Sequence, residues 1–373
     1  MKPFFLYKGK NMKIVIAPDS FKGTISAMEA AICIENGIKK IIPKTEFIKI
    51  PMADGGEGTV KTMIEASNGK IITQKVMDPL NREIEAHFGI MGDGETAVIE
   101  MASASGLPLL KNEEKNPLIT TTFGTGQLIK AALDNNVKKV ILGIGGSATV
   151  DGGAGMAQAL GVKLWDSHGK KLGHGGEVLK NLASIDISQM DERIKKTQFL
   201  VACDVDNPLL GDNGAAKIYG PQKGATPGMV DILENSLGIY AQKIQDFLNV
   251  EVAGLNGAGA AGGLGAGLVA FCNASLMPGI DIVIQTIGLE EKVKDANLLI
   301  TGEGQLDYQT AFGKAPAGAA KTAKKYNIPV IAIGGALGNK ASIINEYGID
   351  AYFSALRTSM SNEQIEKYAK EML

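Results

Sequence analysis

Short apolar runs that end in glycine-rich polar loops and then give way to a helical pattern occur at both ends of this chain. Near the N-terminus, KIVIA at 13–17 leads into PDSFKGT and then into an amphipathic pattern that begins at Ser26. FIKI at 47–50 repeats this order, followed by ADGGEG and a helical segment at 60–66. A continuous apolar run rich in β-branched residues is typical of a strand buried on both faces, and strands that alternate with helices form parallel sheets. This end of the chain is therefore predicted to be βαβα.

The C-terminal part of the chain repeats the same order of elements. Strands are predicted at 297–301, 329–333 and 350–355, with helices at about 315–325 and 363–370. The first of these strands runs into GEGQLD, in which we expect a turn at Gly302–Gly304, and the second runs into Gly334-Gly335. Because the two ends share one pattern, we predict an α/β fold whose Rossmann-like parallel-sheet domain combines residues 12–68 and 285–373.

The middle of the chain has a different pattern. Three predicted strands follow one another without helices between them, which favours antiparallel or mixed pairing. They cover 71–76, 84–89 and 96–101, and later strands at 137–142, 163–165 and 198–202 are mixed with helices, including a long one at 231–248. At 373 residues the chain exceeds the usual size of a single core. We therefore predict a second α/β domain with a mixed sheet, residues 69–284, inserted into the first.

Charge and cysteine usage restrict the class of partner. The 38 Lys and Arg residues nearly balance the 40 Asp and Glu residues, and no long run of like charges occurs, so nucleic acid and membrane surfaces are excluded as partners. The three cysteines are widely spaced and form no CxxC pair, which predicts reduced thiols in a cytoplasmic protein. Residues 1–11, whose apolar run is too short for a signal peptide, are expected to be an upstream start or an extension. No pattern indicates an oligomeric state.

The 47 glycines of the chain gather in clusters that mostly follow apolar runs, a placement that predicts backbone brought close to a ligand. Ligands of open parallel sheets bind beyond the carboxyl ends of the strands. In the terminal domain those ends carry Asp19, Ser20 and Lys22, then Asp54 and Glu57, and then Glu303 and Asp307. A single Asp in such a place is usually a helix cap or turn former. The whole set suits a hard cation such as Mg²⁺ together with substrate phosphates.

Two further segments of the middle domain carry polar groups. Asp204 and Asp206 follow the strand 198–202 at positions i and i+2, so that in an extended segment both point the same way, as a metal or hydroxyl site requires. An Asx turn before Pro208 is the alternative. Lys223 stands on a rigid turn within GPQKGAT.

The stretch GIGGSATVDGGAG at 143–155 admits a dinucleotide site. Gly143, Gly145 and Ala148 follow a strand with the spacing of the Rossmann fingerprint, and Asp166 closes the next apolar run. An NAD(P)-dependent oxidoreductase that uses Gly143–Ala148 and Asp166 is therefore an alternative function. Its weakness is the polar loop between the glycines and the expected helix. A P-loop is excluded because no Gly-Lys pair has the Ser or Thr and the upstream glycine of that motif.

Taken together, these segments resemble the bacterial glycerate kinase family of the glycerate 2-kinase type, which is neither P-loop nor ribokinase-like. The matching segments include APDSFKGTISA, PMADGGEGT, TTTFGTGQLI, GIGGSATVDGGAGMAQALG, VACDVDNPLLG, YGPQKGATP and TGEGQLDYQTAFGKAP, in family order. The resemblance implies ATP-dependent phosphorylation of D-glycerate, with 2-phosphoglycerate favoured over 3-phosphoglycerate as the product. It also implies a Mg²⁺ requirement and a two-domain α/β architecture with the active cleft between the domains.

Given this resemblance, we hypothesise roles for the candidate residues, because phosphoryl transfer depends on positioning and charge neutralisation. Backbone N–H groups of Gly145, Gly146 and Ser147 and of the Gly302–Gly304 turn bind the ATP phosphates, and Asp204, Asp206 and Glu303 hold Mg²⁺. Glycerate or the transferring phosphoryl group is bound by Lys22 and by Lys223 or Lys314, with Asp19 and Ser20 nearby. Asp54 or Asp307 accepts the proton of the substrate hydroxyl. Asp151 either contacts metal and substrate or caps the following helix.

Overall fold

The structure is a computed structural model, and it describes residues 12–373 except 22, 54 and 57. Contacts divide the chain into two compact units. The first unit runs to Asn68 and resumes from Gly279 to Leu373, and the second is the continuous segment Gly69–Pro278. None of the helices in the described part of the chain is both long and apolar enough to cross a membrane.

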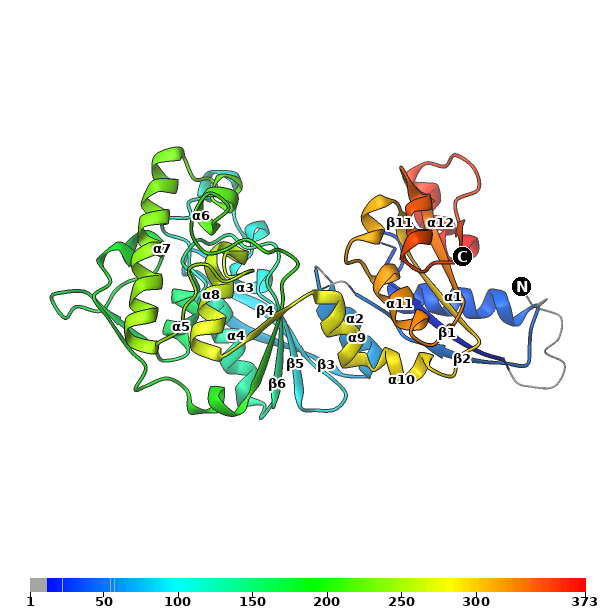
Figure 1. The fold of residues 1–373 in the computed structure, drawn as a ribbon, viewed down its shortest axis with the longest axis horizontal. Helices are drawn as coiled ribbons and strands as arrows, with labels where there is room; N and C mark the ends of the chain where they lie inside the picture. Colours follow the sequence, from blue (N-terminus) through cyan, green and yellow to red (C-terminus); the bar gives the residue numbers. More distant parts are fainter. Residues whose placement is uncertain (1–11, 22, 54, 57) are drawn as a thin grey trace. The chain divides into compact units, whose positions relative to one another are not determined.

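The first unit contains a five-stranded sheet in which all described pairings are parallel, in the order β13-β12-β11-β1-β2. Figure 1 labels its strands β1, β2 and β11. The strands are β1 Met12–Pro18, β2 Thr45–Lys49, β11 Leu298–Leu306, β12 Val330–Leu337 and β13 Ala351–Ser354. Its helices are α1 Ala27–Lys39, α2 Thr59–Ser67, α9 Gly279–Ile287, α10 Leu289–Val293, α11 Ala315–Lys324 and α12 Asn362–Met372, with short 3-10 helices η7 Tyr308–Ala311 and η8 Ala341–Tyr347. The predicted parallel sheet from both chain ends is confirmed.

The strand order places a topological switch point in this sheet. From β1 the chain continues outward to β2, whereas from β11 it continues in the opposite direction to β12 and β13. Helix α1 begins at a capping box in which Ser26 and Glu29 bond reciprocally, and its Ala31 and Ile34 pack on Ile14 and Ile16 of β1. The switch point therefore lies between β1 and β11, where open α/β sheets bind their ligands.

Strands β11 and β12 are longer than predicted, which corrects the expected Gly302–Gly304 turn. Pairing between β11 and β12 continues to Leu306 and Leu337, so Gly302–Gly304 and Gly334-Gly335 lie within strands. A Cβ atom on Gly302 would lie 2.1 Å from the carbonyl oxygen of Ile333. The glycine thus allows close approach of two strands, and the predicted Gly302–Gly304 turn is wrong.

The second unit contains a six-stranded mixed sheet in the order β10-β9-β6-β5-β4-β3. The strands are β3 Lys70–Met77, β4 Glu83–Ile90, β5 Thr96–Glu100, β6 Lys139–Gly143, β9 Gln198–Ala202 and β10 Ser275–Met277. β3, β4 and β5 pair antiparallel and the remaining pairs are parallel, as the change of pattern predicted. The strand predicted at 163–165 forms as β7 Lys163–Trp165 but pairs with β8 Ser184–Asp186 in a separate two-stranded sheet.

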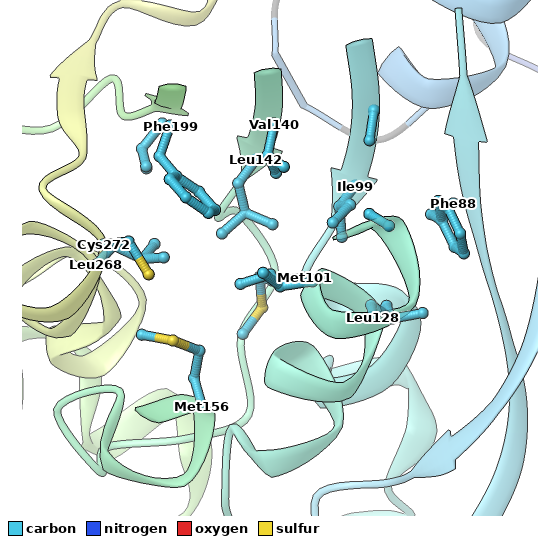
Figure 2. Close-up of a cluster of buried hydrophobic side chains, with 14 of the residues drawn as sticks. Phe88, Ile99, Met101, Leu128, Val140, Leu142, Met156, Phe199, Leu268 and Cys272 are labelled. Atoms are coloured by element: carbon cyan, nitrogen blue, oxygen red, sulfur yellow. The ribbon is translucent and has the colours of Figure 1, made fainter. Parts of the chain in front are cut away.

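Helices of the second unit are α3 Ala102–Ser105, α4 Phe123–Asp134, α5 Ala154–Ala159, α6 Ala215–Tyr219, α7 Pro227–Leu248 and α8 Ala260–Cys272. Its 3-10 helices are η2 Leu107–Leu109, η3 Asn112–Glu114, η4 Glu177–Asn181, η5 Glu192–Lys196 and η6 Pro221–Lys223. In the core of this unit, strand residues such as Phe88, Leu142 and Phe199 meet Leu128 of α4 and Leu268 of α8 (Figure 2). Complete burial of each such side chain stabilises the fold by about 1.5–3 kcal/mol.

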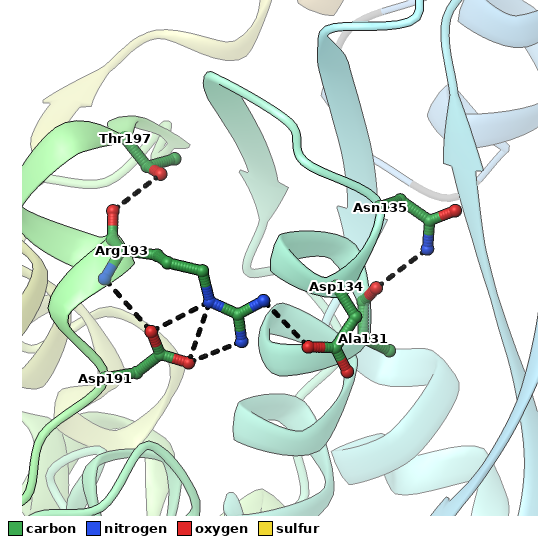
Figure 3. A network of polar contacts seen from close by, with 6 residues as sticks. All are labelled: Ala131, Asp134, Asn135, Asp191, Arg193 and Thr197. Atoms are coloured by element: carbon green, nitrogen blue, oxygen red, sulfur yellow. Dashed lines mark hydrogen bonds and ion pairs between the residues drawn. The ribbon is translucent and has the colours of Figure 1, made fainter.

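A polar network fixes the segment that leads into β9. The Arg193 guanidinium bonds to both carboxylate oxygens of Asp191 and to Asp134 at the end of α4 (Figure 3). Asp191 also accepts a hydrogen bond from the backbone N–H of Arg193 and so caps η5. The hydrogen bonds from Arg193 lower the pKa of Asp191, which keeps this carboxylate charged. η5 is thereby held against α4.

Candidate active site

The first group of predicted site residues lies at the switch point of the first unit. Asp19 follows β1, its backbone N–H donates to the Gly302 carbonyl oxygen at 2.8 Å, and its buried carboxylate accepts a hydrogen bond from the Ser20 backbone N–H at 2.6 Å. Glu303, also buried, occupies the neighbouring strand β11. We call Asp19, Ser20, Glu303, Asp307, Thr310 and Lys314 the switch-point cluster.

Glu303 already has two polar partners in this cluster. Its carboxylate accepts hydrogen bonds from the Thr310 hydroxyl at 2.5 Å and from the Lys314 ammonium at 3.2 Å. Burial raises the pKa of Glu303, and the bonds from Thr310 and Lys314 oppose that rise. The Lys314 side chain is 30% exposed, so its ammonium can reach an anion in solvent.

Asp307 has a capping function. Its carboxylate accepts a hydrogen bond from the Gln309 backbone N–H at 2.8 Å, at the start of η7, and another from the Gln305 side chain at 2.9 Å. A carboxylate that accepts such bonds at a helix start is a typical N-cap. The role of Asp307 as proton acceptor stays a prediction.

A polar hollow of about 500 Å³ opens beside Ser20. Its walls include Thr24 and Ser26 before α1 and Gly58, Lys61 and Glu65 at α2. This volume is within the range of small-molecule sites, and a lysine with several hydroxyl groups suits a small hydroxy acid. Lys22, Asp54 and Glu57, which the sequence predicted for this region, lie outside the described residues.

The second group lies in the second unit, on the turn 143–155 that follows β6. Gly145 and Gly146 are exposed, and Gly146 has a φ of +73° that favours glycine. Neighbouring segments hold the turn at Gly146 and just after it, through Leu107 N–H to the Gly146 carbonyl at 2.8 Å and the Thr120 hydroxyl to the Ala148 carbonyl at 2.9 Å. We call this segment the glycine turn. Its exposed tip is a fixed loop that can receive an anion.

Asp151 is completely buried at the end of the glycine turn. Its carboxylate accepts hydrogen bonds from the Thr122 backbone N–H at 2.8 Å and from the Thr122 hydroxyl at 2.9 Å. It also accepts from the N–H groups of Gly153 and Gly155, at 3.1 and 3.2 Å, where α5 begins. Of the two alternatives for Asp151, these contacts are those of a cap.

Lys223 lies inside the protein, although the sequence suggested a lysine available on a turn. The side chain is 1% exposed, and its Nζ donates to the Ser147 hydroxyl oxygen at 2.6 Å and to the Thr149 carbonyl oxygen at 2.7 Å. Burial lowers the pKa of Lys223 to about 7, with the negative charge of Asp151 opposing the shift. The lysine therefore supports the glycine turn from the interior of the protein, through its bonds to Ser147 and Thr149.

Asp204 and Asp206 are exposed in an irregular segment after β9. Within the residues that the structure describes, no three His, Cys, Asp or Glu side chains gather to hold a metal ion. Two exposed carboxylates nevertheless match the donor set of Mg²⁺, which usually keeps several waters and takes other ligands from substrate phosphates.

The dinucleotide interpretation does not fit the structure. The Asp166 carboxylate accepts hydrogen bonds from the backbone N–H groups of His168 and Lys170, so it forms a turn. Helix α5 begins only at Ala154, near the end of the glycine turn, whereas the fingerprint requires a helix that opens within the first glycines.

A model of the glycerate kinase family matches residues 14–373. The chain belongs to the glycerate kinase family. It is 52% identical to a glycerate kinase of Halalkalibacterium halodurans over 360 residues, 96% of this chain and 95% of that protein. It is 52% identical to the glycerate 2-kinase of Escherichia coli over 345 residues, 92% of this chain and 91% of that protein. A crystal structure of a glycerate kinase 2 from Salmonella typhimurium matches 97% of this chain and 95% of its own, with a TM-score of 0.91 and 50% identity.

Membership of the glycerate kinase family makes ATP the phosphate donor, and no relative supports the oxidoreductase alternative. Our sequence reasoning did not assign Thr122 and Thr310, whose hydroxyl groups bond the two buried carboxylates Asp151 and Glu303. The run TTTFGTG carries a signal for the first of them. Thr120, Thr121 and Thr122 are all buried, and buried hydroxyl groups need hydrogen-bond partners.

Proposed function

We propose that this protein transfers the γ-phosphoryl group of ATP to the 2-hydroxyl of D-glycerate. The observation that carries the proposal is the 52% identity to a glycerate 2-kinase over nearly the whole of both chains. The switch-point cluster and the glycine turn add a physical basis. The glycine turn offers an exposed glycine loop, and the switch-point cluster offers a partly exposed lysine and several carboxylates. Phosphoryl transfer needs groups of these kinds.

In the proposed mechanism the ATP phosphates bind at the exposed tip of the glycine turn, where Gly145 and Gly146 leave room for phosphate oxygens. Asp204 and Asp206 are the residues that would hold Mg²⁺, which when bound neutralises charge on the phosphates. Gly302 and Gly304 are not assigned to the phosphates because their backbone is part of β11. Glu303 is assigned to hold Lys314 in place.

Glycerate is assigned to the polar hollow beside Ser20, where its carboxylate can bind Lys61. Lys22, which the sequence predicts to bind the substrate, lies outside the described residues. Lys314 is assigned to bind the transferring phosphoryl group, since its side chain is partly exposed. The proton of the attacking hydroxyl passes to a carboxylate, and Asp54 is the candidate because Asp307 already caps η7.

The product distinguishes the two hydroxyl groups of glycerate. With D-glycerate, ATP and Mg²⁺, we expect a product whose proton-coupled phosphorus resonance is a doublet, because the 2-carbon bears one hydrogen. Phosphorylation of the 3-hydroxyl would give a triplet. Removing Mg²⁺ with a chelator should abolish turnover, and adding Mg²⁺ should restore it. A purified, folded protein that makes no ADP in the presence of glycerate would contradict the proposal.

A further inference from the structure

The Lys223 amine is buried directly behind the glycine turn. It contacts two atoms of that turn, the Ser147 hydroxyl oxygen at 2.6 Å and the Thr149 carbonyl oxygen at 2.7 Å. Neither partner is charged, and a buried cation without an ionised partner is costly. The exposed tip Gly145-Gly146, which can receive an anion, is adjacent to Ser147 in the sequence.

Hydrogen-bond chemistry at Ser147 is coupled to the charge of this amine. The Thr149 carbonyl can only accept, so one N–H of Lys223 always points to it. In the neutral amine, the lone pair can accept the Ser147 hydroxyl hydrogen. In the ammonium form there is no lone pair, so Ser147 must accept from Lys223 and its own hydrogen is free to point elsewhere.

We propose that Lys223 takes up a proton when the phosphates of ATP bind at the glycine turn, and that Ser147 then donates its hydroxyl hydrogen to a phosphate oxygen. Lys223 is thus a positioning residue that acts through Ser147, and at alkaline pH the buried charge appears only when an anion is present to stabilise it. The proposal rests on the proposed function, because it takes ATP as the anion.

The surroundings of Lys223 are compatible with both charge states. Burial lowers its pKa to about 7, so in the free protein a modest change in nearby charge is sufficient to alter its protonation. The centroid of the Tyr219 ring lies 5.9 Å from Nζ, which favours the cation. The titratable and charged groups around this site are Asp151, Tyr219, His174, Tyr240 and Lys115, the last through its backbone and Cβ against Gly224.

The test is proton uptake measured by titration calorimetry. A non-hydrolysable imido analogue of ATP with Mg²⁺ is titrated into the protein at pH 8.5, in buffers that differ in ionisation enthalpy. Because Lys223 is mostly neutral at this pH and carboxylates are already ionised, we expect uptake of nearly one proton per bound nucleotide. At pH 6 the lysine is already protonated, so the wild-type protein itself should show almost no uptake.

Two variants make the assignment specific. Lys223→Met keeps the length of the side chain and should bind the analogue at least tenfold more weakly, without uptake at pH 8.5. The matched control is Lys217→Met, a nearby exposed lysine that pairs with Asp212 and should retain the wild-type uptake. Ser147→Ala should weaken binding at least tenfold, and Ser147→Thr, which keeps the hydroxyl, should restore most of it.

Tight binding by the wild-type protein without proton uptake at pH 8.5 would overturn the inference and leave the kinase function intact. The same holds if Lys223→Met retains the uptake. If Lys223→Met does not fold, the proton uptake of the wild-type protein at pH 8.5 and pH 6 still tests the inference. Equal uptake at the two pH values would overturn it. Failure of the analogue to bind, together with absence of turnover, would overturn both the inference and the proposed function.

Discussion

At the scale of single residues, the amine of Lys223 links the stability of the protein to pH. In the unfolded chain a lysine has a pKa near 10.5, whereas burial lowers the folded value to about 7. Between these values the unfolded state binds one more proton than the folded state, so stability rises with pH. Below about pH 7 both states are protonated and the dependence on this group ends.

The direction of this pH dependence gives a prediction for Lys223→Met. Relative to the variant, the wild-type protein should gain about 1.4 kcal/mol in free energy of unfolding for each pH unit between roughly 7 and 10. Chemical denaturation at pH 7, 8 and 9 measures the difference in free energy of unfolding between the wild-type protein and the variant. Lys217→Met is the control, and its difference from the wild-type protein should not change with pH. A constant difference between wild type and Lys223→Met across this range would mean that Lys223 stays charged.

Several residues of the site could be chosen from the sequence, but their burial could not. Asp151 and Lys223 were selected because they stand beside glycines, yet both are buried and bonded to loops distant in sequence. The partner of Lys223 lies 76 residues away, and the N–H that bonds Asp151 comes from Thr122. The local sequence pattern indicates which chemistry a residue can supply. Its burial depends on segments of the chain that meet only after folding.

At the scale of elements, the glycine-rich segment 254–267 shows why the glycine clusters were only partly understood. We expected glycines to bring backbone close to a ligand. In helix α8 they bring backbone close to backbone, since Cβ atoms on Gly262 and Gly267 would lie 1.9 Å from the Thr149 carbonyl oxygen and 2.6 Å from the Gly152 carbonyl oxygen. Helix α8 thus supports the glycine turn, which composition alone does not indicate.

This packing predicts a large effect for Gly262→Ala. The residue has a φ of +70°, and the added methyl group would collide with the carbonyl that also accepts from Lys223. We expect a loss of at least about 2 kcal/mol in free energy of unfolding, measured by chemical denaturation.

Gly238→Ala is the matched control for this change. Gly238 lies in helix α7, and beyond the adjoining residues and the backbone of its own helix a Cβ atom there would have no neighbour within 4 Å. Alanine favours helix and should stabilise the protein by about 0.4–1 kcal/mol. Equal effects of the two substitutions would contradict the account of α8.

The pairing of elements was more predictable than their lengths. Apolar runs without intervening helices correctly predicted antiparallel pairing of β3, β4 and β5, because chain connectivity restricts which strands can be neighbours. The extension of β11 through GEGQL was not predicted, since glycines usually end strands. Here pairing with β12 outweighs that local preference.

At the scale of the whole molecule, the second unit is continuous in sequence and has its own core. Its two hydrophobic clusters draw their buried residues only from positions between Val76 and Ala274. We therefore expect a fragment of residues 69–278 to fold cooperatively, with a single sharp transition in thermal or urea unfolding. Residues 12–68 alone lack β11 and should remain unfolded. A fragment 69–278 without cooperative unfolding would contradict this independence.

The neighbouring strands β1 and β11 also have a consequence for biosynthesis. Lys13 and Asn297, which bond to each other across these strands, are separated by 284 positions. At typical synthesis rates of about 5–20 residues per second, β1 leaves the ribosome about 15–60 s before its partner exists. During that interval the apolar residues of β1 have no β11 to cover them, while residues 69–278 can already be assembling. A nascent chain of this protein should therefore present an unpaired apolar strand near its N-terminus. Chaperones that bind nascent chains can shield this strand until translation is nearly complete.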